Sequence, residues 1–251
     1  MTRARTAAAQ AVTPELMLRK ATLARTSGAR AKYAQRGLEH AGGLDETTRA
    51  LLLRQLYLSH MEGRRFEEAL AVAEQMIEAD VMPDVARQDA ARAQIGLGQP
   101  DKAVEHLRIA GRVSPPARRA FHLWTLGSVL YLHGRPHEAV GALERALRWG
   151  TTDKPLYAAQ LALARLSLGE GEGVDLGALR EALADAPCGQ GYGQFVLGEL
   201  CFAQEDFEAA RRYLSAFVTR VRGGRVALAV ALTGEIRRAD RLLRRLRRGA
   251  R

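Results

Sequence analysis

Residues 120–150 carry two stretches in which apolar residues recur at helical spacing, separated by a short break at 133–136. The apolar stripes consist of Leu123, Leu126 and Leu130 before the break and of Ala139, Val140, Leu143, Ala146 and Leu147 after it. Recurrence every three or four residues places such side chains on one face of an α-helix. So short a break predicts an antiparallel helical pair, and the small residues Gly127 and Ala139 would let its helices approach closely.

The same pattern returns along the chain at nearly constant spacing. Each unit has a break, then a marker residue five positions on, then a large apolar residue four positions further. The markers are Ala34, Ala69, Ala103, Ala139, Asp175, Ala210 and Ala239, at intervals of 35, 34, 36, 36, 35 and 29 residues. One helical pair cannot cover its own apolar stripes, so successive pairs are expected to stack on one another.

The units resemble the tetratricopeptide repeat. That family has a period of about 34 residues, with Leu-Gly in the first helix and Ala followed by a large apolar residue in the second. The matching residues are Leu126, Gly127, Ala139 and Leu143 in one unit and Leu197, Gly198, Ala210 and Leu214 in another. The segment EDFEAA at 205–210 also resembles the usual start of the second helix, so several matches fall in one phase.

The resemblance implies an all-α fold, a right-handed α-solenoid of about six to seven tetratricopeptide-like helix-turn-helix repeats. It covers residues 15–248, and residues 1–14 are expected to form a flexible basic arm. The repeat units are expected at about 15–44, 50–83, 84–116, 120–153, 156–187, 191–222 and 223–248.

Charge is distributed unevenly, with two basic ends around a mildly acidic body. Residues 1–36 carry +7 and residues 211–251 carry +11, whereas residues 37–210 carry −8. No apolar run approaches the ~20 residues of a membrane span, and the N-terminal sequence lacks the apolar core of a secretory signal. Together with two cysteines that suggest no disulfide framework, these features predict a cytoplasmic protein.

Residues with catalytic or metal-binding chemistry do not gather into a motif. His133 and His137 lie on opposite sides of a turn, and the glycine-rich stretch 188–194 has no preceding strand and no following Gly-Lys-Ser/Thr. We therefore expect no catalytic residues, no metal, no cofactor and no enzymatic activity.

The resemblance implies that the first helix of each unit lines a concave groove. Carrying the family's groove positions onto this chain selects seven aromatic residues: Phe121, Trp124, Tyr131, Tyr157, Tyr192, Phe195 and Phe202. Aromatic rings give large contact areas at small entropic cost and often dominate binding. The alternative is that these rings pack between repeats, because one helical position separates a groove residue from a core residue.

The last predicted helix combines an apolar stripe with a basic patch. The stripe is Ala239, Leu242, Leu243 and Leu246, and the patch is Arg237, Arg238, Arg241, Arg244, Arg245, Arg247 and Arg248. One interpretation is a capping helix with a solvated outer face. The other is a site for an acidic protein, nucleic acid or an anionic lipid surface.

The sequence as a whole predicts a protein-protein interaction scaffold. The leading hypothesis is a non-catalytic adaptor or co-chaperone that holds a peptide or helix of another protein in the aromatic groove. The chain has no Asn, which argues against the family's Asn-based clamp for chaperone C-termini. The alternative is a basic-tailed binder of nucleic acid or an anionic membrane surface, with a regulatory role.

Overall fold

A computed structural model of the chain describes residues 13–40 and 44–248, and these residues form fourteen α-helices and one short 3-10 helix. The helices are α1 (Pro14–Leu23), α2 (Ser27–Leu38), α3 (Glu46–Glu62), α4 (Phe66–Glu78), α5 (Pro83–Gly96), α6 (Pro100–Val113), α7 (Pro116–Leu132), α8 (Pro136–Trp149), α9 (Lys154–Leu166), α10 (Leu176–Asp185), η1 (Pro187–Gly189), α11 (Gly193–Ala203), α12 (Phe207–Gly223), α13 (Val226–Ala231) and α14 (Thr233–Arg248). The all-α prediction is confirmed.

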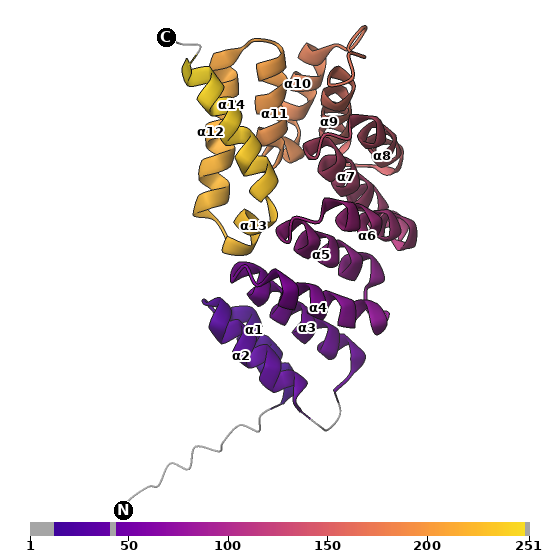
Figure 1. Ribbon diagram of the computed structural model, residues 1–251, viewed down its shortest axis with the longest axis vertical. Coiled ribbons are helices and arrows are strands. Elements are labelled where there is room, and N and C mark those ends of the chain that lie inside the picture. Colours follow the sequence, from indigo (N-terminus) through magenta and orange to yellow (C-terminus); the bar gives the residue numbers. More distant parts are fainter. Residues whose placement is uncertain (1–12, 41–43, 249–251) are drawn as a thin grey trace, which may run out of the picture.

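Helices α1 to α12 pack one after another as antiparallel pairs, and the pairs stack into an elongated body (Figure 1). The first helices of neighbouring pairs also lie side by side, as α7 with α9 and α9 with α11. Together α3, α5, α7, α9 and α11 form the surface that we call the inner face. This arrangement is the solenoid that the sequence period predicts.

Small residues allow the two helices of a pair to approach closely. The marker residues Ala69, Ala103, Ala139 and Ala210 have no exposed surface. A Cβ atom on Gly127 would lie 2.5 Å from Leu143 Cγ, so only a glycine fits there without movement. The close approach predicted at Gly127 and Ala139 is therefore confirmed.

Two parts of the repeat pattern look different in the structure. Asp175 is not a buried marker residue; its carboxylate accepts a hydrogen bond of 2.9 Å from the Ala178 amide and caps the start of α10. At the N-terminus, residues 1–12 of the expected arm lie outside the described residues. Thr13 caps α1 and Pro14 begins it, so these last two residues of the expected arm belong to the first helix.

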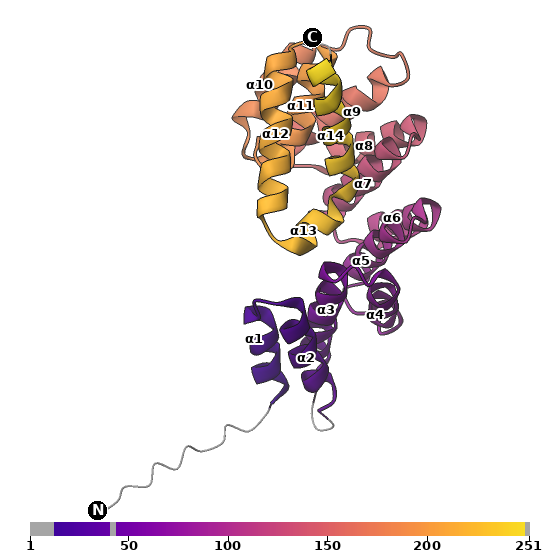
Figure 2. The same ribbon diagram turned by 60° about the vertical axis from the view of Figure 1, so that its left-hand side comes forward.

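The final two helices leave the stacking order. Helix α13 has only six residues and contacts α3 and α5, which lie far away in the sequence. Helix α14 packs along α12 and also reaches α7. Figure 2 shows α13 between α12 and α14 at the end that faces the α5 region. We call residues 225–248 the C-terminal segment; this segment covers part of the inner face.

Candidate functional site

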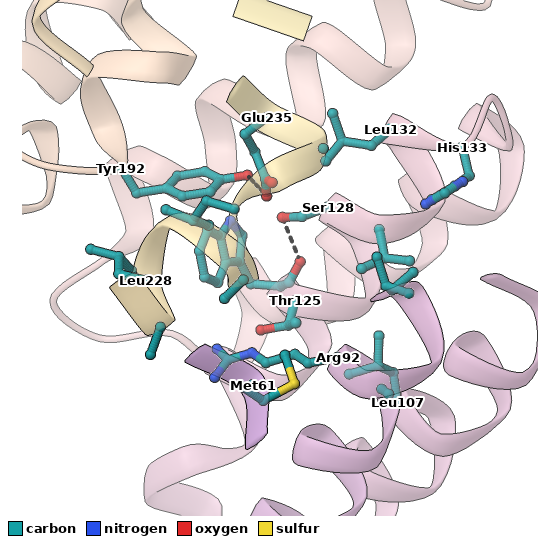
Figure 3. A pocket seen from close by; sticks show the side chains of 18 of the residues that line it. Met61, Arg92, Leu107, Thr125, Ser128, Leu132, His133, Tyr192, Leu228 and Glu235 are labelled. Carbon is teal, nitrogen blue, oxygen red and sulfur yellow. Dashed lines mark hydrogen bonds between the residues drawn. The ribbon is translucent and has the colours of Figure 1, made fainter. Parts of the chain in front are cut away.

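A cavity of about 410 Å³ lies between the C-terminal segment and helices α3, α5 and α7 (Figure 3). This volume falls within the range of about 300–1,000 Å³ that is typical of ligand-binding pockets. Its apolar wall includes Leu58, Met61, Ile95, Leu107, Val129, Leu132 and Leu228. Polar groups enter from several elements, among them Arg92, Ser128, Tyr192 and Glu235.

Five of the seven predicted groove aromatics form a connected row of rings. The ring centroids of Phe121 and Trp124 are 5.7 Å apart, and Trp124 lies 4.8 Å from Tyr192 and 6.2 Å from Tyr157. Tyr192 in turn lies 5.7 Å from Phe195. Such separations and tilted or edge-to-face orientations are favourable for aromatic pairs.

The row runs from the surface into the interior. Phe121 is 41% exposed and Trp124 is half-buried, whereas Tyr157 is 3% exposed and Phe195 is fully buried. The rings of Tyr157 and Phe195 thus pack between helices in this conformation. Of this row, the solvent reaches chiefly Phe121 and, to a lesser extent, Trp124 and Tyr192.

Hydrogen bonds hold Trp124 in a fixed orientation at the edge of the cavity. Its indole Nε1 donates to Gln160 Oε1 at 2.6 Å, which joins α7 to α9. The Ser128 hydroxyl donates to the same Gln160 oxygen at 3.1 Å. A buried donor that finds an acceptor avoids a desolvation penalty, so this network fixes both the ring and the spacing of the two helices.

The other two predicted groove aromatics lie beneath arginines of α14. The guanidinium of Arg238 lies 4.6 Å from the centroid of the Tyr131 ring, and that of Arg245 lies 5.0 Å from the Phe202 ring. Both distances suit cation–π interactions. The structure thus brings together two sets of residues that the sequence assigns to separate sites, the groove aromatics and the basic patch.

Within the basic patch, Arg238 is used internally, whereas the other six side chains are exposed, including Arg245 beside the Phe202 ring. Arg238 forms an ion pair with the buried carboxylate of Glu199 and donates a hydrogen bond of 2.6 Å to the Tyr131 hydroxyl. The six exposed members of the patch are Arg237, Arg241, Arg244, Arg245, Arg247 and Arg248. The predicted stripe of α14 faces the body, since Ala239, Leu242 and Leu246 are buried and Leu243 is half-buried.

Glu235 is a buried carboxyl group at the start of α14. It is 8% exposed, and the Tyr192 hydroxyl donates a hydrogen bond of 3.3 Å to its Oε1 atom (Figure 3). Burial raises the pKa of Glu235 from 4.5 to about 7, because a charged carboxylate is poorly solvated there. This group therefore changes its charge within the physiological pH range.

Replacing Glu235 with glutamine should stabilise the protein above pH 7 and have little effect near pH 4.5. A carboxyl group whose pKa is raised on folding contributes its full stability below pH 4.5 and loses it as the pH rises through about 7. The glutamine variant does not lose this contribution, so its advantage should reach about 2 to 3 kcal/mol at pH 8. Urea denaturation of both proteins across this pH range measures the difference, and an advantage independent of pH would contradict it.

The cavity itself was not predicted from the sequence, although one signal points to it. Glu235 lies four residues before Ala239, on the same face of α14 as the apolar stripe. A carboxyl group in line with a buried stripe is unusual, because charged residues are rarely buried, and it indicates a candidate functional site.

Within residues 13–40 and 44–248, no three His, Cys, Asp or Glu side chains are arranged to hold a metal ion. No helix in these segments is both long and apolar enough to cross a membrane.

Similar structures were found, whereas no family model and no curated protein matches the sequence. TTC0263, a TPR protein of Thermus thermophilus, has 21% identity and a TM-score of 0.51, covering 82% of this chain and 99% of that one. PilF of Pseudomonas aeruginosa has 17% identity and a TM-score of 0.56, covering 86% of this chain and 93% of that one. The apo form of RapI has 13% identity and a TM-score of 0.56, covering 92% of this chain and 84% of that one.

These similarities concern the fold. Tetratricopeptide-repeat folds present extended concave surfaces, which generally serve protein–protein interaction and are typically non-catalytic. The resemblance seen in the sequence is supported over most of the chain. This chain therefore has the fold of the tetratricopeptide-repeat proteins.

Proposed function

We propose that the protein is a non-catalytic adaptor that binds a peptide or helix of another protein on its inner face. The observation that carries the proposal is the row of aromatic rings that begins at the exposed Phe121 and passes along the apolar cavity at Trp124 and Tyr192. Apolar side chains of a partner contribute most to the binding free energy when they displace water from such a surface. A co-chaperone is one form of adaptor that would use this surface.

Replacing Phe121 with serine should weaken binding of this partner by about 30-fold, which corresponds to about 2 kcal/mol for an aromatic contact at an interface. The partner is first identified by affinity capture from native lysate on the wild-type protein at two salt concentrations. Its dissociation constant is then measured by calorimetry for each variant.

A matched control distinguishes the proposed surface from any exposed aromatic ring. Trp149 at the end of α8 is 44% exposed, similar to Phe121 at 41%, but it does not belong to the inner face. Trp149→Ser should leave the dissociation constant unchanged. Equal effects of the two substitutions would contradict the proposed site, provided that both variants keep the melting temperature of the wild type.

A second candidate function rests on the outward-facing arginines of α14. Six of the seven predicted basic-patch residues are exposed, so they are accessible to the phosphates of nucleic acid or of an anionic membrane. Such binding would be non-specific and would weaken steeply with salt. Protein purified at low salt that carries no excess absorbance at 260 nm, and is not retained on DNA or anionic vesicles, would rule this function out.

A further inference from the structure

The C-terminal segment contacts the inner face through the groups expected to hold a partner. Arg238 and Arg245 lie over the rings of Tyr131 and Phe202, and Glu235 accepts a hydrogen bond from Tyr192. Three of the seven predicted groove aromatics therefore contact α14 itself. A ligand of the inner face that retained these contacts would have to resemble α14, with arginines beside an apolar stripe.

A buried carboxylate of the inner face takes its cation from the segment. Residues 225–248 contain eight Arg against Glu235 and Asp240, a net charge of +6. Three buried carboxyl groups lie on the helices of the inner face, Asp84 and Asp89 on α5 and Glu199 on α11. Arg118 pairs with Asp84 and Arg54 lies 3.7 Å from Asp89, so cations of the inner face itself accompany both of these carboxyl groups. Glu199 instead forms its ion pair with Arg238 of the segment. Because a buried carboxylate favours a cationic neighbour, the position beside Glu199 selects arginine or lysine.

The docking of α13 is loose by the standards of a protein core. Val230 is its only buried side chain, whereas Val226 is 57% exposed and Leu228 is 47% exposed. The cavity of about 410 Å³ lies beneath the segment, so over this area the segment is not packed against the body. Helix α13 therefore contributes little buried apolar surface, and little free energy opposes its own departure, whereas α14 is held by its buried stripe of Ala239, Leu242 and Leu246.

The connection to α12 permits the segment to move. Helix α12 ends at Gly223, and Gly224 follows in an extended conformation before α13 begins. Two consecutive glycines have the widest choice of backbone angles, so a hinge at this point costs little. The loose docking and the glycine pair lie at the same end of the segment.

We infer that the inner face is a binding site for an amphipathic helix that carries arginines beside an apolar stripe. Residues 225–248 occupy this site in the free protein, and a partner helix of the same chemistry displaces them. This inference rests on the proposed function, because it names the chemical class of the partner and the competitor that controls its access. The apparent affinity for the partner then depends on the difference between the binding free energies of the partner helix and of the segment, and not on the surface alone.

The test uses the full-length chain and a fluorescently labelled synthetic peptide of residues 225–248 as the probe. Val230→Asp places a charge among the buried side chains of α3 and should release the segment, so the peptide should bind at least tenfold more tightly than to the wild type. Val226→Asp makes the same change at an exposed position of the same helix and should bind the peptide like the wild type. Equal peptide affinities for the two variants would overturn the inference.

A substitute variant and a control peptide complete the test. If Val230→Asp loses helical content in circular dichroism, Arg238→Gln is used in its place to release the segment, since this substitution removes the ion pair between α14 and Glu199. A peptide with Glu in place of both Arg238 and Arg245 should bind at least tenfold more weakly, and unchanged binding would overturn the proposed chemistry. A captured partner whose affinity is the same for wild type and Val230→Asp would overturn the competition while the adaptor function stands.

Discussion

Replacing Arg238 with alanine should lower the free energy of unfolding by about 3 kcal/mol, because it leaves the buried carboxylate of Glu199 without its cation. Glu199 is 4% exposed, and no described residue hydrogen-bonds to its second carboxylate oxygen, Oε2. Burial already raises the pKa of Glu199, and the ion pair with Arg238 opposes this shift. The same substitution removes the cation above Tyr131. Urea denaturation measures the loss, and hydrogen exchange should locate it in α14.

Two further variants separate the ion pair from general charge effects. Arg244→Ala removes one positive charge from an exposed position of the same helix and should change stability by less than about 0.5 kcal/mol. Adding Glu199→Gln to Arg238→Ala should recover most of the loss, because a neutral amide is less costly to bury than a carboxylate. A double variant as unstable as Arg238→Ala alone would show that packing of the arginine, and not its charge, is responsible.

The repeat frame could be predicted from the sequence because it depends on contacts between neighbouring helices. A buried Ala recurs at the fourth position of α4, α6, α8 and α12, and in two units a glycine, Gly127 or Gly198, stands at the same distance before that Ala. These contacts form within one unit of about 34 residues, so each unit repeats the same signal. The unit at 156–187 shows the limit, because Asp175 acts as a helix cap where other units have a buried Ala.

The aromatic residues show why the repeat pattern did not predict which rings are exposed and which are buried. Trp124 and Phe195 hold equivalent positions relative to the buried Ala of their units, Ala139 and Ala210, yet Trp124 is half-buried and Phe195 is fully buried. Spacing along one helix gives the face of a side chain relative to its neighbours, but not the depth at which that helix is packed. The depth at which a ring is buried depends on how α12 and α14 pack over the first helices, and the spacing within one helix does not give this packing.

The C-terminal segment was the least predictable part for the same reason. The apolar stripe of α14 gave its buried face correctly, but α13 is too short to show a helical period, and its contacts with α3 join helices far apart in the sequence. The pairing of Arg238 with Glu199 likewise joins residues 39 positions apart. Sequence alone therefore indicated both the aromatic groove and the basic helix, but not that one lies on the other.

The second large effect is expected at Gly198, where the two helices of a repeat touch closely. A Cβ atom at this position would lie 2.5 Å from Leu214 Cγ and 3.2 Å from the Leu214 backbone nitrogen. The side chain of Leu214 can move only into a filled core, since it is fully buried, and the backbone of α12 cannot move without shifting the whole helix. Gly198→Val should therefore lower the free energy of unfolding by about 3 kcal/mol, as overpacking of a dense core does.

Gly141 provides the matched position for this experiment. It lies in α8, is exposed, and an added Cβ would have no atom within 4 Å. Gly141→Val should be neutral or slightly stabilising, because valine favours the helix more than glycine does. In the Gly198→Val background, Leu214→Ala should restore part of the lost stability by making room for the new methyl groups. If it instead adds to the loss, the contact between Gly198 and Leu214 does not set the spacing of α11 and α12.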